Sequence, residues 1–425
     1  MAREIGFGRY RFDAQIWVIF LVSVVAAFGF GVVFPFIAIY LAQAGHGGLA
    51  LGDVATGIIM MAYMATGTFF MVVGGAWADR FGRRKIMIAS TIGEALLLCM
   101  YSFAGEFWGF LAIALAEGAV GSLYQPAAGA MMADMVPPDR RPEAFSLLRI
   151  GFNSGMAIGP LVGALLIITM DFRSMFVIAG VMVGIAGLFI VFWTRETLSV
   201  KPGDEFQYKD IRIAAKDRVF MGFCVLISMT FFLYAQAISS LPNYATAPQD
   251  LGIELSAYSL VFAMTAGMVV LLQIPMTWVA VKLRRSTAMG AGQALMALGI
   301  GSIFLVHDLA GVMIAMAVFT IGELVHSAIY TTVVADMAPE KLRGTYMGVS
   351  GVAFGIGDSL GMFAGMALLG LLAVRGYTWI VMLAIGIPTA IGYFALRRYL
   401  TGKVDMGTIK SEVKPPLEPP VHEAH

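Results

Sequence analysis

Long apolar segments, separated by short polar stretches, constrain this chain more than any other feature of its sequence. Twelve segments can be delimited, near residues 15–42, 54–78, 86–104, 109–133, 144–169, 174–194, 219–244, 256–281, 288–306, 310–335, 346–373 and 378–399. Each is close to the roughly 20 residues that a helix needs to cross a bilayer. A helix satisfies its own backbone hydrogen bonds in lipid. The sequence therefore predicts an all-α membrane protein with twelve transmembrane helices.

The composition excludes several classes of protein. Hydrophobic residues make up 59% of the chain and charged residues only 13%, whereas soluble domains carry about 25% charged residues. The net charge of +1 gives no reason to expect nucleic acid as a partner. Both cysteines lie inside apolar segments, so we expect no disulfide framework and no metal site. A phosphate-binding G-x-x-x-x-G-K loop does not occur, so we expect neither ATP nor another cofactor.

Polar stretches and basic residues predict the domains and the orientation. The longest polar stretch between spans, 195–218, separates a six-span unit at 1–194 from another at 219–400, and a Pro-rich tail at 401–425 is predicted to be disordered. With the amino terminus inside, all 28 Lys and Arg residues except Arg173 and Arg375 fall on the inner side. Positive charge collects on the cytoplasmic side of membrane proteins. We therefore expect both termini and the central loop to be cytoplasmic.

The two halves resemble each other at a nearly constant offset. Residues 133–137 (ADMVP) end the fourth span, and residues 335–339 (ADMAP) end the tenth, 202 positions later. Arg173 and Arg375 are also 202 positions apart. Repeats in the same orientation predict two similar bundles related by an axis along the membrane normal, with a binding site between them near the midplane.

Two motifs resemble those of a known family. Residues 75–85 (GAWADRFGRRK) resemble the signature loop of the major facilitator superfamily. Residues 155–164 (GMAIGPLVGA) resemble the motif of its proton-coupled drug antiporters. The resemblance extends over about 11–398 and implies two six-helix bundles, alternating access, and a monomer in the cell (inner) membrane. The chain departs from the antiporter pattern at Ala114, where an arginine is usual.

The first motif predicts a conformational latch formed by Gly75, Asp79, Gly82, Arg83 and Asp134. Gly82 allows a tight turn, and Asp79 is placed to accept hydrogen bonds from the amino end of a neighbouring helix, where the dipole favours an anion. The resemblance implies that this neighbour is the eleventh span and that Arg83 pairs with Asp134. Such a latch would hold the outward-facing state and break when the protein opens inward.

The second motif places Gly155, Gly159 and Gly163 on one face of the fifth span, with Pro160 among them. Glycines four residues apart make a smooth helix face, and the proline removes one backbone hydrogen bond, so the helix can bend. Two interpretations stay open, a role in the direction of transport and close packing alone.

Acids within the spans are the candidates for proton coupling: Glu323, Glu117 and Asp358, with His326 three residues after Glu323. A carboxylate at mid-depth needs a partner, water or a proton. Glu117 and Glu323 fall at similar positions of equivalent spans. His326 shares a helix face with Glu323 and could relay a proton, join a metal site or make an ordinary contact between helices. The resemblance places the span of Glu94 on the outer scaffold, where a packing role is expected.

The family implies that spans 1, 4, 7 and 10 line the cavity. The predicted cavity residues are Phe34, Tyr40, Tyr234, Gln236 and Gln273. No lysine or arginine is predicted at mid-depth, so anionic substrates fit poorly, whereas a neutral or cationic amphiphile suits an apolar cavity with a few acids.

The sequence thus favours a secondary active transporter that exports lipophilic or cationic small molecules in exchange for protons, the multidrug efflux type. Its predicted partners are this substrate, protons and the lipid bilayer. Because fold alone does not determine function, three alternatives stay open. They are proton-coupled or facilitative nutrient uptake, a lipid or amphiphile flippase, and a sensor built on the same fold.

Overall fold

The computed structural model describes residues 4–5, 12–44, 48–137, 141–198, 208–339 and 342–406, which are almost entirely helical. A short antiparallel pair, β1 (Glu4–Ile5) with β2 (Phe12–Asp13), precedes the first helix. Most of the predicted disordered tail lies outside the described residues, but its first part forms a short helix, α16 (Gly402–Met406). The central loop likewise contains α8 (Tyr208–Lys216).

Every predicted span coincides with a helix or with two consecutive helices. The amino-terminal half contains α1 (Ala14–Ala42), α2 (Asp53–Phe81), α3 (Arg83–Tyr101), α4 (Phe107–Gly121), α5 (Tyr124–Met135), α6 (Arg141–Thr169) and α7 (Phe172–Trp193). The carboxy-terminal half contains α9 (Arg218–Ile238), α10 (Ser240–Thr246), α11 (Leu255–Ala280), α12 (Arg285–Ser302), the 3-10 turn η4 (Ile303–Leu305), α13 (Leu309–Met337), α14 (Arg343–Leu371) and α15 (Tyr377–Leu396). The predicted all-α membrane fold is confirmed.

Eleven stretches in the described part of the chain are long and apolar enough to cross a membrane. The remaining predicted span is α3, which is 19 residues long. It carries Arg83, Arg84 and Lys85 in its first turn and Glu94 in its middle. Those charges, and not its length, separate it from the other spans.

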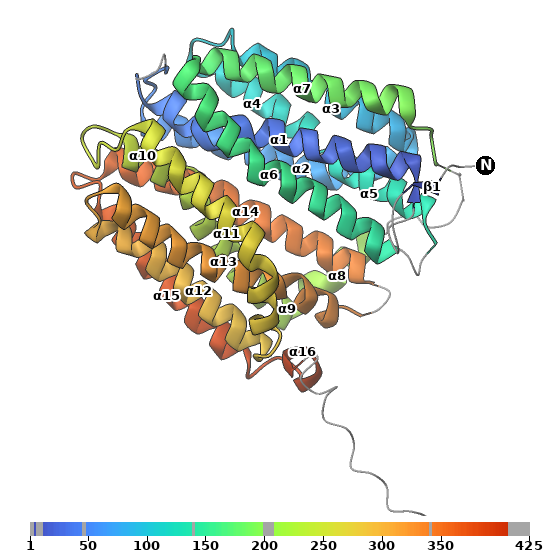
Figure 1. The fold of residues 1–425 in the computed structure, drawn as a ribbon. Coiled ribbons are helices and arrows are strands. Elements are labelled where there is room, and N and C mark those ends of the chain that lie inside the picture. Colours follow the sequence, from blue (N-terminus) through green and yellow to red (C-terminus); the bar gives the residue numbers. More distant parts are fainter. Residues whose placement is uncertain are drawn as a thin grey trace, which may run out of the picture.

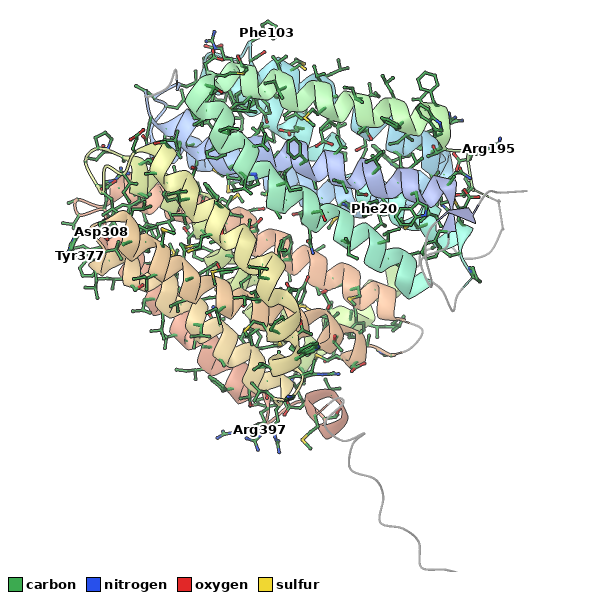
Figure 2. All side chains as sticks on the ribbon, viewed as in Figure 1. Phe20, Phe103, Arg195, Asp308, Tyr377 and Arg397 are labelled. Atoms are coloured by element: carbon green, nitrogen blue, oxygen red, sulfur yellow. The ribbon has the colours of Figure 1, made fainter. Side chains whose placement is uncertain are left out.

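The helices form two bundles, α1–α7 and α9–α15 (Figure 1). Large apolar side chains cover the outer surface of both, and Phe69, Leu271 and Leu371 are among the most exposed. Figure 2 shows Asp308 and Tyr377 at one end of the bundles and Arg195 at the other. We call these the Arg375 end and the Arg83 end, after the residues that organise them. The predicted orientation makes the Arg83 end cytoplasmic.

The two bundles lie close together at the Arg375 end and diverge toward the Arg83 end (Figure 1). The glycines along α2 and α14 show this divergence. A Cβ added at Gly57 would lie 2.9 Å from that of Met366, and one added at Gly355 would collide with the side chain of Thr68. Further toward the Arg83 end, a Cβ added at Gly75 or Gly348 would meet no atom within 4 Å. The structure is therefore closed at the Arg375 end and open at the Arg83 end.

Candidate functional site

A cavity of about 240 Å³ lies between the bundles and contains the carboxyl group of Glu323. It is lined by α1 and α6 of one bundle and by α9, α11 and α13 of the other. We call it the Glu323 pocket. Of the predicted cavity residues, Phe34 and Tyr234 line it, and Pro160 of the antiporter-like motif lies beside them. Among its described lining residues Glu323 alone is charged.

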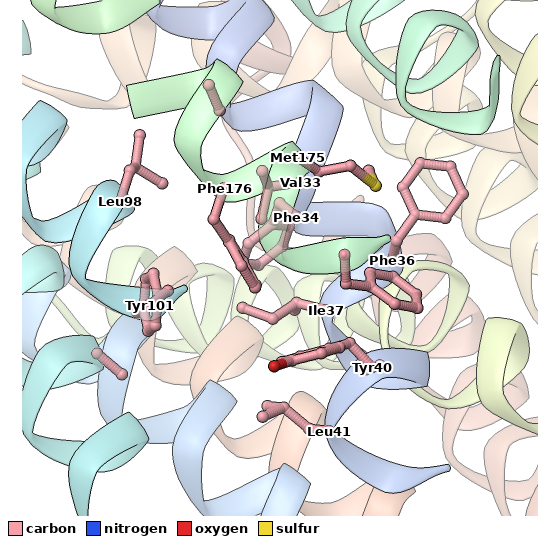
Figure 3. Packing of buried hydrophobic residues seen from close by; sticks show 14 of the residues in the cluster. Val33, Phe34, Phe36, Ile37, Tyr40, Leu41, Leu98, Tyr101, Met175 and Phe176 are labelled. Carbon is pink, nitrogen blue, oxygen red and sulfur yellow. The ribbon is translucent and has the colours of Figure 1, made fainter. Parts of the chain in front are cut away.

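Three predicted cavity residues do not line a described pocket. Tyr40 is fully buried inside the amino-terminal bundle, where its ring centroid lies 4.9 Å from that of Phe172 and 5.4 Å from that of Phe176 (Figure 3). Gln236 is fully buried and donates from Nε2 to the backbone carbonyls of Phe232 and Gly361, at 2.8 and 2.9 Å.

Gln273 of α11 is the third, and its amide lies 3.5 Å from the hydroxyl of Thr277 on its own helix. Burial inside a bundle keeps Tyr40 and Gln236 away from the cavity, whereas the assignment of the partly buried Gln273 stays a prediction. An aromatic or amide side chain on an apolar helix can equally face the interior of its own bundle.

Glu117 of α4 lies in a small apolar pocket of the amino-terminal bundle, together with Phe30, Phe34 and Tyr63. It is 6% exposed, and its Oε2 accepts a hydrogen bond of 2.6 Å from the hydroxyl of Tyr101. The cluster around Tyr101 is otherwise apolar (Figure 3). Glu117 and Glu323 therefore do not share one cavity, although they fall at similar positions in the repeat.

Glu94, which we expected to pack against neighbouring helices, instead borders a second cavity of about 240 Å³. The cavity is lined by residues of α1 to α6, and Phe354 of α14 adds to its wall from the other bundle. The sequence marks Glu94 as a charge at mid-span, but the resemblance placed its span on the outer scaffold and so favoured a packing role.

His326 and Glu323 point to different neighbours. Nε2 of His326 lies 3.1 Å from the hydroxyl of Tyr393 on α15, which lies 2.9 Å from the hydroxyl of Thr230 on α9. Glu323 faces the pocket instead. The structure does not bring the proposed relay pair together. Among the residues that the structure describes, no group of three or more His, Cys, Asp and Glu side chains is placed to hold a metal ion.

Asp358 of α14 is 3% exposed, and its Oδ1 has no hydrogen-bond partner in the described part of the chain. It does not line any of the pockets above. The neighbouring Gly357 packs against the backbone of Ser228 in α9. Asp358 is thus a buried carboxyl at the contact between two helices of one bundle.

The predicted latch is formed in part. Arg83 makes an ion pair with Asp134 and a hydrogen bond of 3.2 Å to Oδ1 of Asp79. Gly82 connects α2 to α3 with a φ of 103°, which confirms the tight turn. Asp79, however, is 66% exposed, and among the described residues it accepts no hydrogen bond from the amino end of α14. This separation agrees with bundles that are open at the Arg83 end.

A residue outside the motif completes this region. Glu196, which follows α7, accepts hydrogen bonds from the backbone N–H groups of Arg83 and Arg84 at 3.0 and 3.2 Å. It therefore binds the amino terminus of α3, where the helix dipole favours an anion. Sequence reasoning had assigned that kind of contact to Asp79.

The same arrangement recurs in the carboxy-terminal bundle. Arg285 pairs with Asp336 at 2.6 Å, and Asp405 of α16 accepts a hydrogen bond of 2.9 Å from the N–H of Ser286. Arg285 and Asp336 each lie 202 positions after Arg83 and Asp134. Each bundle therefore carries its own ion pair and its own helix cap at the Arg83 end.

The Arg375 end is closed by a polar network between the bundles, which we call the Arg375 network. Arg375 makes an ion pair with Asp53 of the amino-terminal bundle and donates from Nε to Oδ2 of Asp250 at 2.7 Å. The Asn243 amide donates to Oδ1 of Asp53 at 2.5 Å and accepts from Gln43 at 2.7 Å. The sequence marks Arg375 as a basic residue on the outer side and as the repeat equivalent of Arg173, but it gives no sign of this network.

Burial raises the pKa of the Asp250 carboxyl above its usual range, and the Arg375 guanidinium beside it acts in the opposite direction. Asp250 belongs to the loop between α10 and α11. Its side chain is only 5% exposed in this closed arrangement. The network therefore holds a buried titratable group at the closed end of the protein.

The glycines of the second motif pack directly on α1. A Cβ added at Gly159 would lie 2.7 Å from Cα of Gly31, and one added at Gly155 or Gly163 would collide with a backbone carbonyl of α1. The close-packing interpretation of these glycines is confirmed. Their role in the direction of transport stays a prediction.

The sequence model of the Major Facilitator Superfamily matches residues 19–357 and 226–419. A protein of Planococcus maritimus named Na(+), Li(+), K(+)/H(+) antiporter is 28% identical over 360 residues, which cover 77% of this chain and 83% of that protein. Multidrug resistance protein MdtH of Sodalis glossinidius (strain morsitans) is 26% identical over 378 residues, which cover 88% of this chain and 91% of that protein.

Solved structures share the fold. A POT family transporter in complex with 5-aminolevulinic acid superposes with a TM-score of 0.81 and 14% identity, covering 94% of this chain and 99% of that chain. A bacterial homolog to the human lysosomal transporter Spinster, in an inward-facing and occupied conformation, superposes with a TM-score of 0.73 and 16% identity. The match covers 93% of this chain and 98% of that chain. The motifs, the repeat and the family match agree. This membrane transport protein, which is not an enzyme, belongs to the major facilitator superfamily.

Proposed function

We propose that the protein is a proton-coupled exporter of lipophilic, often cationic small molecules in the bacterial inner membrane. The observation that carries this function is the Glu323 pocket. It lies between the bundles, its walls are apolar and aromatic, and its one charge among the described lining residues is a carboxylate. Such a pocket favours an apolar or cationic ligand, and a carboxyl group at this depth readily exchanges a proton.

The proposed orientation makes this structure the inward-facing state, with both termini in the cytoplasm. A substrate would enter the Glu323 pocket from the open Arg83 end. Reorientation would then break the Arg375 network and bring Asp79 toward the amino end of α14. Proton binding from outside and substrate binding from inside would alternate at the pocket.

The name of one relative, a Na(+), Li(+), K(+)/H(+) antiporter, supports exchange against protons. The name of another, multidrug resistance protein MdtH, supports drug export. The two names differ in the substrate that they indicate. A flippase is less well supported. The groove between α2 and α14 on the outer surface is lined by apolar residues and by Thr68 and Ser359. Each of those hydroxyls donates to a carbonyl of its own helix. The groove therefore offers little to a polar lipid headgroup.

The test uses proteoliposomes with an imposed proton gradient and a lumenal pH indicator. Lipophilic cations, neutral drugs, Na⁺, Li⁺ and K⁺ would be added in turn. We expect lipophilic cations to trigger proton flux in the wild type and in Glu106→Gln, which removes an exposed acid at the Arg375 end. Glu323→Gln should abolish that flux while the protein still folds.

Gradient-independent uptake of a polar nutrient, without flux for any lipophilic compound, would overturn the exporter. Proton flux triggered only by Na⁺, Li⁺ or K⁺ would show that the substrate is an inorganic cation and not a lipophilic compound.

A further inference from the structure

The cavity beside Glu94 is separate from the Glu323 pocket but adjoins it. We call it the Glu94 pocket. Its volume is about 240 Å³, and Glu94 is the charged residue among its described lining residues. Phe152 of α6 lines both pockets, and Phe354 of α14 completes the wall of the Glu94 pocket from the opposite bundle. The two pockets therefore lie next to each other, on either side of Phe152.

The carboxylate of Glu94 has no donor among the described residues. The hydroxyls of Ser23, Thr68 and Ser122 line the pocket, but each donates to a backbone carbonyl of its own chain segment, at 2.9, 2.9 and 3.1 Å. The charged side chain that acts on Glu94 electrostatically is Glu117, which has the same sign. Glu94 is thus a membrane-embedded acid without a donor among the described residues, and it needs water, a proton or a bound cation as its partner.

The rest of the pocket selects among cations. Phe30, Tyr63 and Tyr124 form aromatic walls on the side of the amino-terminal bundle, and Phe354 adds another on the opposite side. Aromatic faces attract an organic cation and bury its apolar groups. A bare metal ion would instead require several oxygen ligands in one place. The Glu94 pocket supplies one carboxylate, the amide of Gln125 and several hydroxyls, most of which are already bonded.

We propose that the Glu94 pocket is a binding subsite for lipophilic organic cations, in which the Glu94 carboxylate pairs with the positive centre of the ligand. Proton exchange then takes place at Glu323, in the adjoining pocket. This inference rests on the proposed function and deepens it, because it separates the group that binds the substrate's charge from the group that binds the proton. Glu94 belongs to the amino-terminal bundle and Glu323 to the other, so both bundles take part.

The first experiment measures equilibrium binding of tetraphenylphosphonium to the full chain in detergent at fixed pH, without a gradient. Triphenylphosphine oxide serves as a neutral aromatic probe. We expect Glu94→Gln to weaken binding of the cation at least tenfold and binding of the neutral probe less than threefold. Glu106→Gln is the matched control and should bind both probes like the wild type.

Three outcomes would overturn either the Glu94 subsite or the proposed substrate class. Unchanged cation binding in Glu94→Gln, or loss only in Glu323→Gln, would place the cation elsewhere and leave the proposed function intact. A wild type that binds no lipophilic cation would instead overturn the proposed substrate class itself. Equal loss of both probes in Glu94→Gln would show a structural role for Glu94 and refute the charge pairing.

A second measurement needs no variant. A hydrophobic carbodiimide labels membrane-embedded carboxyl groups, and peptide mass spectrometry locates the label. We expect tetraphenylphosphonium to reduce labelling of Glu94 in the wild-type protein, and triphenylphosphine oxide at matched occupancy to reduce it less. Equal labelling of Glu94 with and without the cation would contradict the subsite.

Discussion

Arg375→Gln should shift the protein from the arrangement that is closed at the Arg375 end toward one that is open there. In the closed arrangement the guanidinium of Arg375 contacts Asp53 and Asp250, whose side chains are only 10% and 5% exposed. Removing it leaves two buried carboxylates facing each other without their shared cation. When the Arg375 end opens, the same acids would face water and would need no cation. Removing Arg375 therefore destabilises the closed arrangement much more than the open one.

The size of the shift follows from these contacts. Breaking a buried ion pair by removing one partner costs about 3–5 kcal/mol. Arg375 is itself 17% exposed, so we take the lower figure, about 3 kcal/mol. Each 1.4 kcal/mol is about a tenfold change in an equilibrium constant, so the closed-to-open ratio at the Arg375 end should fall by roughly two orders of magnitude. A population of about 99:1 would become nearly even.

The assay is pulsed electron–electron spin resonance between labels on the two bundles at the Arg375 end. Glu106→Cys and His307→Cys place labels on exposed sites of opposite bundles, in a background without Cys99 and Cys224. We expect a second, longer distance to appear in Arg375→Gln. Arg173→Gln, at the exposed repeat equivalent of Arg375, should retain the wild-type distribution.

Identical distance distributions in the wild type and Arg375→Gln would refute the reasoning, because the network would then contribute nothing to closure. A longer distance in both Arg375→Gln and Arg173→Gln would point to a general effect of charge at this end of the protein.

The other predictions concern acidity and packing. Burial raises the pKa of Asp250 in the closed arrangement, so added protons should favour that arrangement. The fraction of molecules at the shorter label-to-label distance should increase as the pH is lowered, and less steeply in Asp250→Asn. Equal pH dependence in both proteins would contradict this. Gly163→Leu should lower the free energy of unfolding by about 1–3 kcal/mol, because a side chain there meets the backbone of α1. Gly222→Ala, with open space around it, should unfold in detergent like the wild type, and equal melting of both variants would refute the packing argument.

Some of the site could be predicted because it depends on local sequence. The turn at Gly82 and the pair of Arg83 with Asp134 follow from a motif whose residues lie at the ends of neighbouring spans. The contact of Glu196 with α3 could not be predicted in this way. Which carboxylate reaches a helix terminus depends on how α7 ends beside α3, and hydropathy does not contain that information.

The directions of side chains on apolar helices could not be predicted either. Glu323 and His326 are three residues apart, so their directions differ by about 60° around the helix. That difference is enough for one to face the pocket and the other to reach Tyr393 on α15. Tyr40 illustrates the same limit, because α1 is apolar on all sides and no polar face shows which way it is turned.

The distribution of polar contacts suggests what determines the balance between the two states. At the Arg83 end the ion pairs, Arg83 with Asp134 and Arg285 with Asp336, lie within single bundles, so they make each bundle rigid and need not break during rocking. At the Arg375 end the ion pair of Arg375 with Asp53 joins the two bundles.

Apolar contacts within each bundle are kept when the bundles rock, so they add little to this balance. The difference in free energy between the states therefore depends mainly on the few polar groups that change partners. Those groups are the Arg375 network on one side, Asp79 with the amino end of α14 on the other, and the carboxyl groups that bind protons or cations between them. A ligand that pairs with Glu94, or a proton on Glu323, acts on the same small set of charges, and so either one can bias the direction in which the bundles rock.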